Sequence, residues 1–243
     1  MLDLDGTTVP FKSYTPSERV REAIGKIRDR IHVCIATGRI LPDVTPVIET
    51  LGLSGPCVLD QGAQIYDPEK NRIIREISLD TMLIGPLRRV LENRGLVLGF
   101  FDGVRDAPIS EFREGQKALS MYCLDYDKSL TEQLLSELRE FPTIAIHRLT
   151  GSTPVTEGVE VTNAMATKQH GIAEVARILG IESHEIIGVG DGYNDFPLLM
   201  ACGLKVAMGN AVPELKAIAD FIAPTVDEDG VAVVIEKFIL ESI

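Results

Sequence analysis

Two aspartates near the start of the sequence are the first residues whose types and spacing could do chemistry. Asp3 and Asp5 flank a leucine in the stretch MLDLDGT, and a glycine and a threonine follow them. One interpretation is a solvated turn, because Asp-Gly pairs favour turns. The other is a buried strand that delivers both carboxylates to one point. The choice depends on whether other reactive groups converge on the same place.

Later segments carry polar residues in comparable positions. The stretch ATGR at 36–39 follows an apolar run, and so does the stretch GDGYND at 190–195. Lys168 opens the helical pattern that precedes the second of these runs. Loops at the carboxyl ends of parallel strands lie along one edge of a sheet and line its ligand crevice. We therefore expect four acids, the Thr37 hydroxyl, the Asn194 amide and the lysine to converge there.

The carboxylates of such a set call for a metal ion. Four carboxylates packed together cannot all stay ionised without a compensating cation. Their hard oxygen atoms are the ligands that Mg²⁺ prefers in proteins. We therefore expect Mg²⁺ as a cofactor, with four candidate metal ligands: Asp3, Asp5, Asp191 and Asp195.

The remaining polar groups fit a phosphate ester. A Mg²⁺ ion held by carboxylates keeps room for a phosphate oxygen. The Thr37 hydroxyl, the Lys168 amine and backbone N–H groups near Gly38 would hold the other phosphate oxygens. One carboxylate could then attack phosphorus in line. The second acid of the first loop could protonate the departing oxygen and afterwards activate water.

The pattern of the chain predicts how these groups are positioned. Helical patterns at about 15–30 and 41–51 alternate with apolar runs at 32–36 and 57–59, and a similar alternation returns after residue 167. This order predicts an α/β fold with a doubly wound, mainly parallel sheet. Residues 78–162 differ in texture and predict a small inserted α+β domain, so that residues 1–77 and 163–243 form the catalytic core.

Composition excludes several classes of function. The chain has 243 residues and a formal net charge of −12, which makes a nucleic-acid partner unlikely on charge grounds. No apolar run reaches the roughly 18 residues that a membrane span needs, and no signal-peptide pattern opens the chain. The four cysteines form no CxxC pair and are expected to be reduced core residues. We expect a cytoplasmic monomer or homodimer.

The ordered motifs resemble a known family. The stretch DLDGT at 3–7, ATGR at 36–39, Lys168 and GDGYND at 190–195 are similar to the haloacid dehalogenase superfamily. The resemblance is closest to its Cof-like (type IIB) phosphatases, whose cap domain sits between the second and third motifs. It implies a Rossmann-like core with a cap, and a phosphatase acting on small phosphorylated metabolites such as sugar phosphates or phosphoglycolate.

The resemblance also implies a role for each matching residue. Asp3 corresponds to the nucleophile that forms an aspartyl-phosphate, and Asp5 to the general acid/base, whose backbone carbonyl corresponds to a metal ligand. Asp191 corresponds to a direct Mg²⁺ ligand and Asp195 to an outer one. The remaining matches are phosphate-binding: Thr37, Gly38, Lys168 and Asn194, the last as a phosphate or lysine contact.

The sequence departs from the family pattern at two points. Family members usually have four or five apolar residues before the first aspartate, whereas only two precede Asp3 here. A truncated start would explain this, and we expect a short first strand that lies centrally in the sheet. The stretch DQGA at 60–63 stands where the family often has Asn-Gly-Ala. The sequence does not predict what this second change does.

Other functions remain open at this point. A phosphomutase would return the phosphoryl group to another hydroxyl, and a phosphometabolite-binding protein would not turn over. The glycines at 188–192 lack the G-x-G-x-x-G spacing of dinucleotide-binding proteins. Arg39 could shape the phosphate pocket or pair with an acid. Asn210 could contact the site or cap the next helix.

Overall fold

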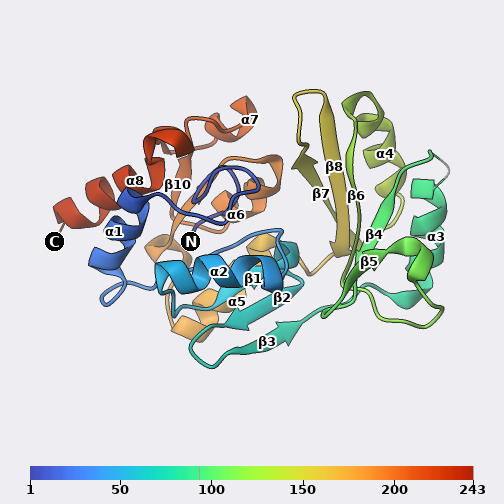
Figure 1. The fold of residues 1–243 in the computed structure, drawn as a ribbon, viewed down its shortest axis with the longest axis horizontal. Helices are drawn as coiled ribbons and strands as arrows, with labels where there is room; N and C mark the ends of the chain where they lie inside the picture. Colours follow the sequence, from blue (N-terminus) through green and yellow to red (C-terminus); the bar gives the residue numbers. More distant parts are fainter. Residues whose placement is uncertain (93, 243) are drawn as a thin grey trace.

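The computed structural model describes residues 1–92 and 94–242, which form two bodies side by side (Figure 1). The first body draws its hydrophobic core from residues 2–66 and 172–235, and the second from residues 79–161. Both ends of the chain lie in the first body. The two bodies therefore follow from one chain that leaves a fold, builds a second and returns.

The sheet of the first body is parallel. Strands β9 (Ile187–Gly190), β10 (Leu204–Ala207) and β11 (Phe221–Ile222) pair in the order β11-β10-β9. Leu2 makes parallel bridges to Val189 on one side and Ile35 on the other, and Ala36 bridges in parallel to Val58 of β1 (Cys57–Leu59). This continuous parallel arrangement confirms the predicted α/β class.

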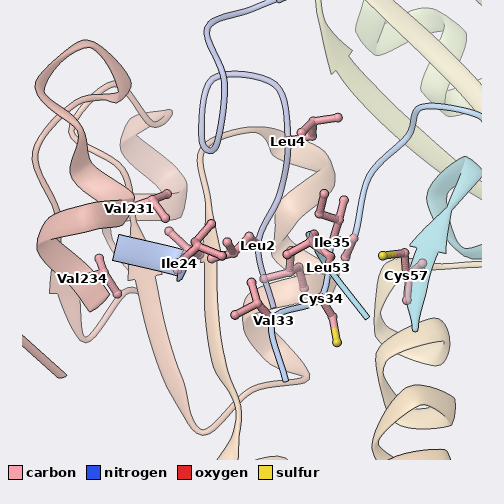
Figure 2. Packing of buried hydrophobic residues seen from close by; sticks show 14 of the residues in the cluster. Leu2, Leu4, Ile24, Val33, Cys34, Ile35, Leu53, Cys57, Val231 and Val234 are labelled. Carbon is pink, nitrogen blue, oxygen red and sulfur yellow. The ribbon is translucent and has the colours of Figure 1, made fainter. Parts of the chain in front are cut away.

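The first strand is as short as the sequence predicts, and it is central. Leu2 N–H donates to the Cys34 carbonyl at 2.9 Å, and Asp3 N–H donates to the Val189 carbonyl at 2.9 Å. The Leu2 side chain is buried, and Figure 2 shows it with Ile24 on one side and Ile35 on the other. Backbone bonds to both neighbours therefore hold the segment in spite of its length.

Helices connect and cover these strands. Their bounds are α1 (Glu18–Ile27), α2 (Leu41–Leu51), α5 (Lys168–Leu179), α6 (Phe196–Met200), α7 (Pro213–Lys216) and α8 (Gly230–Phe238). Helix α1 is shorter than predicted at both ends. Ser17 is its N-cap, because its Oγ accepts the Val20 N–H at 3.2 Å, and the preceding Thr15 and Pro16 do not enter the helix. After Ile27 the chain becomes exposed, so the apolar face that stabilises the helix ends there.

A three-stranded antiparallel meander leads towards the second body. Strands β1, β2 (Gln64–Asp67) and β3 (Arg72–Glu76) pair antiparallel in that order. Short 3₁₀ turns join many elements of the described chain: Asp60–Gly62, Ile109–Glu111, Lys128–Leu130, Ser183–Glu185, Tyr193–Asp195, Val226–Glu228 and Leu240–Ser242. All three residues of the turn at Asp60–Gly62 have positive φ: Asp60 at 50°, Gln61 at 57° and Gly62 at 119°.

The second body is an antiparallel sheet with helices on one face. Its strands are β4 (Leu98–Phe101), β5 (Asp106–Pro108), β6 (Ser120–Asp127), β7 (Ile144–Thr150) and β8 (Thr156–Asn163), in the order β5-β4-β6-β8-β7. Helices α3 (Thr81–Glu92) and α4 (Thr131–Leu138) lie on the side away from the first body (Figure 1). The opposite face of the sheet is thereby left to face the first body.

Two further sequence expectations can be compared with the structure. All four cysteines are buried and unbridged, as their apolar surroundings indicate. Among the described residues, no helix is both long and apolar enough to span a bilayer.

The packing of α1 gives a first prediction. Ile24 is fully buried in the core, whereas Ile178, on α5, is 40% exposed. We expect Ile24→Ala to lower the free energy of unfolding by about 2–5 kcal/mol, because it leaves a cavity in close-packed surroundings. The matched change Ile178→Ala should alter it by less than about 0.5 kcal/mol. Urea unfolding followed by circular dichroism measures both, and equal losses would contradict this account of the core.

Candidate active site

Three of the predicted acids meet where the central strands end. One carboxylate oxygen from each of Asp3, Asp191 and Asp195 lies within 4.8 Å of the other two. Asp3 follows the central segment at Leu2, and the other two lie in the loop after β9. Segments almost 190 residues apart are thus joined through neighbouring parallel strands, and Val189 N–H donates to the Met1 carbonyl beside them at 3.1 Å.

Lys168 lies inside this acidic cluster. Its Nζ donates to Asp3 Oδ1 at 2.5 Å and to Asp195 Oδ1 at 2.6 Å, and its side chain is fully buried. Burial alone would lower the pKa of Lys168, but the ion pairs with Asp195 and Asp3 outweigh it and hold the pKa above its ordinary value. The lysine therefore stays charged. Thr167 positions it by capping α5, since its Oγ1 accepts the His170 N–H at 3.2 Å.

One lysine does not balance three carboxylates. Burial and the neighbouring Asp195 raise the pKa of Asp3 to about 7. Burial raises the pKa of Asp191 well above its ordinary value, and the neighbouring carboxylates of Asp3 and Asp195 raise it further. These shifts are consistent with an excess of negative charge in a largely buried place. The donor set is all oxygen and anionic, so it fits a hard divalent cation such as Mg²⁺.

The loop after Asp3 is shaped around Asp191. Gly6 has a φ of +75°, and a Cβ on it would lie 2.4 Å from Asp191 Oδ2, so no larger residue fits there. Thr7 Oγ1 donates to Asp191 Oδ1 at 2.8 Å. Asn210 Nδ2 donates to the Gly6 carbonyl at 2.8 Å and to Asp191 Oδ2 at 3.3 Å. Of the two interpretations of Asn210, contact with the site is therefore the one that the structure supports.

Asp195 organises the loop that carries Asp191. Its Oδ2 accepts the backbone N–H groups of Asp191 at 2.9 Å and Gly192 at 2.8 Å, while its Oδ1 accepts from Lys168. Its side chain is fully buried. Both carboxylate oxygens of Asp195 thus accept hydrogen bonds from protein groups, so this side chain orients the loop that carries Asp191.

The carboxylate of Asp5 lies apart from the three clustered acids. Arg39 binds it in a bidentate pair, with Nε to Oδ2 at 2.7 Å and Nη2 to Oδ1 at 2.6 Å, and Lys12 N–H donates to Oδ1 at 2.8 Å. Arg39 also donates to the Ser13 carbonyl and lies over the Tyr14 ring. The structure thus does not bring the Asp5 carboxylate to the cluster of Asp3, Asp191 and Asp195. A metal contact through the Asp5 backbone carbonyl stays a prediction.

A pocket of about 750 Å³ opens over these residues. Of the eight residues predicted as catalytic, phosphate-binding or metal ligands, six line it: Asp3, Asp5, Thr37, Gly38, Asp191 and Asn194. Thr37 is itself almost wholly buried, and its Oγ1 accepts the Arg39 N–H at 3.1 Å. Lys168 and Asp195 do not line the pocket and are fully buried.

Gln61 joins the two bodies at the pocket, and the sequence did not predict this. Its Nε2 donates to Glu160 Oε2 on β8 at 2.9 Å, and its Oε1 accepts from Asn194 Nδ2 at 3.3 Å. A Cβ on Gly38 would lie 2.2 Å from Gln61 Nε2, so the side chain also abuts the Thr37-Gly38 loop. The departure from the family pattern at 60–63 marked this stretch as unusual in the sequence, but it did not indicate which residues Gln61 would contact.

Asp60, the neighbour of Gln61, forms a buried acid pair with Glu160. Ser120 Oγ donates to Asp60 Oδ1 at 2.8 Å, while Asp60 Oδ2 is buried with no hydrogen-bond partner among the described residues. Burial and the neighbouring Glu160 raise the pKa of Asp60 well above its ordinary value, and burial also raises the pKa of Glu160. Ionisation of either carboxyl group therefore makes ionisation of the other less favourable.

A second cavity, of about 500 Å³, lies at the opposite end of the central strands. Its lining is mainly apolar and includes Met1, Ile27 and Phe238. It contains none of the clustered acids, so the chemistry belongs to the larger pocket.

Comparison with known proteins agrees with this geometry. The model of the haloacid dehalogenase-like hydrolase family matches residues 1–109 and 101–235. The chain belongs to the haloacid dehalogenase-like hydrolases. It is 30% identical to a 5-amino-6-(5-phospho-D-ribitylamino)uracil phosphatase, YcsE of Bacillus subtilis, over 98% of this chain and 94% of that protein.

Other relatives are phosphatases of the same superfamily. A phosphoglycolate phosphatase of Methanothermobacter thermautotrophicus is 25% identical over 98% of this chain and 96% of its own length. The structure of the HAD subclass IIB sugar phosphatase BT4131 superposes with a TM-score of 0.82 at 23% identity and covers 98% of this chain and 97% of that one. The Cof-like resemblance is confirmed, and the protein is an enzyme of the phosphatase type.

The charge of the cluster predicts a metal-dependent change in stability. Mg²⁺ should raise the melting temperature of the wild type, because binding at about 100 times Kd adds about 2.7 kcal/mol to the free energy of unfolding. Asp191→Asn should remove most of this gain, while the exposed control Asp29→Asn should keep it. Thermal melts with and without Mg²⁺ test this. A wild type that does not respond, or an Asp191→Asn protein that responds fully, would contradict the metal assignment.

The buried acid pair predicts a pH-dependent stability. The raised pKa of Asp60 means that the folded protein keeps a proton which the unfolded chain loses near pH 4, so this carboxyl lowers stability increasingly as the pH rises. Asp60→Asn has no such proton, and asparagine tolerates the positive φ. It should therefore lose less stability than the wild type between about pH 5 and about pH 9.

Urea unfolding at several pH values measures this difference. Asp29→Asn, an exposed acid, serves as the matched control and should follow the wild type. Parallel curves for Asp60→Asn and the wild type would show that the pair is not strained by its charge.

Proposed function

We propose that the protein is a Mg²⁺-dependent phosphomonoester hydrolase that acts on small phosphorylated metabolites through an aspartyl-phosphate on Asp3. One observation carries the proposal. Asp3 lies in contact with a charged lysine and beside Asp191, at a pocket that Thr37, Gly38 and Asn194 also line. A nucleophile, a cation and candidate phosphate-binding groups therefore share one place.

In the first step, Asp3 attacks phosphorus. Lys168 holds Oδ1 of Asp3, which fixes the side chain and leaves its second oxygen for the attack. Asp3 and Asp191 would hold Mg²⁺, with Asp195 keeping the Asp191 loop in place. When bound, the ion would neutralise charge on the phosphoryl oxygens and so lower the barrier to attack by an anion.

The Asp5 carboxyl completes both halves of the reaction. It would give a proton to the departing ester oxygen and later take one from the water that attacks the phosphoryl group on Asp3. In the structure it is paired with Arg39 on the pocket wall. In the proposed cycle, the Asp5 carboxyl group therefore exchanges its contact with Arg39 for a contact with the leaving oxygen.

We propose residues 78–162 as the cap domain and residues 1–77 with 163–243 as the catalytic core. The sheet face opposite α3 and α4 supplies Leu149, Gly158 and Glu160 to the pocket. A cap in this place excludes bulk water and contacts the part of the substrate that departs.

A first strand that held Asp3 poorly would favour the alternative of a binding protein without turnover. Backbone hydrogen bonds on both sides of the segment at Leu2 and Asp3 argue against poor anchoring. A phosphomutase would use the same Asp3 chemistry but would yield an isomer without free phosphate. Measuring phosphate release separates it from the hydrolase.

The nucleophile predicts the main test of function. Wild-type protein should release phosphate from p-nitrophenyl phosphate with Mg²⁺ and not with excess EDTA. Asp3→Asn should lower kcat by about 10³-fold or more, as loss of other covalent nucleophiles does. The control Asp29→Asn, an exposed acid on the core, should keep wild-type rates. A wild type inactive towards this ester and a panel of phosphorylated metabolites would reject the proposal, as would activity in Asp3→Asn.

A further inference from the structure

The pocket wall outside the cluster of Asp3, Asp191 and Asp195 is acidic. It contains the carboxylates of Asp43, Asp125, Glu160 and Asp227. Two cations line the same pocket, and both are paired. Arg39 holds Asp5 in a bidentate pair, and Lys12 Nζ lies 3.6 Å from Asp125 Oδ2. A second anionic group on a substrate would therefore meet carboxylates, and each lining cation already has an acidic partner.

Glu160 is the most enclosed of these four acids. It is 6% exposed, yet it lines the pocket from strand β8 of the second body. Gln61 donates to its Oε2, and Gln61 itself contacts Asn194 and the Gly38 loop. Glu160 thus lies one side chain away from residues assigned to the phosphate. The carbon skeleton of a substrate whose phosphoryl group is bound by those residues would lie near Glu160.

The surroundings of Glu160 fix its orientation. Gln61 holds it from the first body, and the buried carboxyl group of Asp60 lies beside it. A carboxylate largely kept from water is a strong hydrogen-bond acceptor, and its two oxygens can together accept more than the one hydrogen bond from Gln61. A ligand hydroxyl could donate a further hydrogen bond, whereas a ligand carboxylate would place a second negative charge beside it.

We propose that Glu160 determines specificity by accepting a hydrogen bond from a hydroxyl of the leaving group, while the acidic wall rejects a second anionic group. The inference rests on the proposed hydrolase function. It names the substrate class as phosphate monoesters of uncharged polyhydroxylated alcohols. Of the two classes expected from the sequence, sugar-type phosphates are thus favoured over phosphoglycolate-type acids. Bisphosphates, on which a phosphomutase depends, are disfavoured for the same reason.

A matched pair of esters tests the inference on the wild type. Glycerol 3-phosphate and 3-phosphoglycerate share a three-carbon skeleton and differ in a hydroxymethyl group against a carboxylate. Each is measured by phosphate release and as a competitor of p-nitrophenyl phosphate. We expect kcat/KM to favour glycerol 3-phosphate by about tenfold or more.

The outcomes separate this inference from the proposed function. If neither p-nitrophenyl phosphate nor any ester of the metabolite panel is hydrolysed with Mg²⁺, the hydrolase proposal fails. If any of these esters is hydrolysed but 3-phosphoglycerate is used as well as glycerol 3-phosphate or better, the specificity inference alone fails. It also fails if glycerol 3-phosphate is neither hydrolysed nor competitive.

Two variants assign the preference to residues. Glu160→Gln keeps the shape and can still accept from Gln61, but it loses the charge, so the ratio of the two kcat/KM values should fall by about tenfold. Glu114→Gln makes the same change at an exposed position of the second body, outside the pocket lining, and should leave the ratio unchanged. An unchanged ratio in Glu160→Gln protein that melts cooperatively would overturn the role of Glu160.

Asp125→Asn provides a gain of function that misfolding cannot imitate. Asp125 has a φ of 56°, which asparagine tolerates, and the amide oxygen can still accept the Ser152 N–H. The change removes one acid from the wall and releases Lys12 from its ion pair. We expect kcat/KM for 3-phosphoglycerate to rise several-fold, with a smaller change for glycerol 3-phosphate. No rise would overturn the assignment of the wall.

Discussion

A buried lysine between two carboxylates is the interaction on which the rest of the site depends. Lys168 has no exposed surface, and its charge is retained only because Asp3 and Asp195 accept from it. Removing one partner of such a set leaves a charge uncompensated in the interior, which commonly costs about 3–5 kcal/mol. The same contacts orient the proposed nucleophile and the loop that carries Asp191. Stability and chemistry therefore make the same demand on these three residues.

The parallel sheet makes that arrangement possible with very little chain. The segment at Leu2 is bonded to the strands on both of its sides, so Asp3 projects from the middle of the sheet although it is the third residue. The loop after β9 leaves the neighbouring strand at the same edge. Adjacent parallel strands bring their carboxyl ends together whatever the distance along the chain. A short strand in a central place is thereby sufficient to position a reactive group.

The second body adds selection to a site that the first body nearly completes. Gln61 contacts Gly38 and Asn194 in the first body and Glu160 in the second, so one side chain at a left-handed backbone position couples the candidate phosphate-binding residues to the sheet of the second body. Arg148, on β7, also lies over the Tyr193 ring in the loop between Asp191 and Asn194, with the guanidinium carbon 4.2 Å from the ring centroid. These contacts connect the proposed choice of leaving group with the groups that perform the transfer.

The sequence alone determined the fold class, the order of the motifs and several elements to the residue. Helix α2 and strand β1 have the predicted bounds and helix α5 begins at Lys168 as predicted, because apolar periodicity and local caps decide such elements. Helix α1 was predicted to start too early, because Thr15 and Ser17 are both competent caps and only the packed backbone chooses between them. The convergence of Asp3, Asp191 and Lys168 was predictable too, since strand order implies it.

Tertiary structure decided the rest. The Asp5 carboxylate pairs with Arg39 and does not join the other three acids. This is a choice between side-chain conformations, which the spacing of residues along the sequence does not encode. Gln61 and Glu160 are separated by 99 positions and lie in different bodies, so no local pattern connects them. The burial that raises the pKa of Asp60 exists only after the two bodies have met. Periodicity reports which face of an element is buried, whereas the partner across an interface depends on the packing of the whole chain.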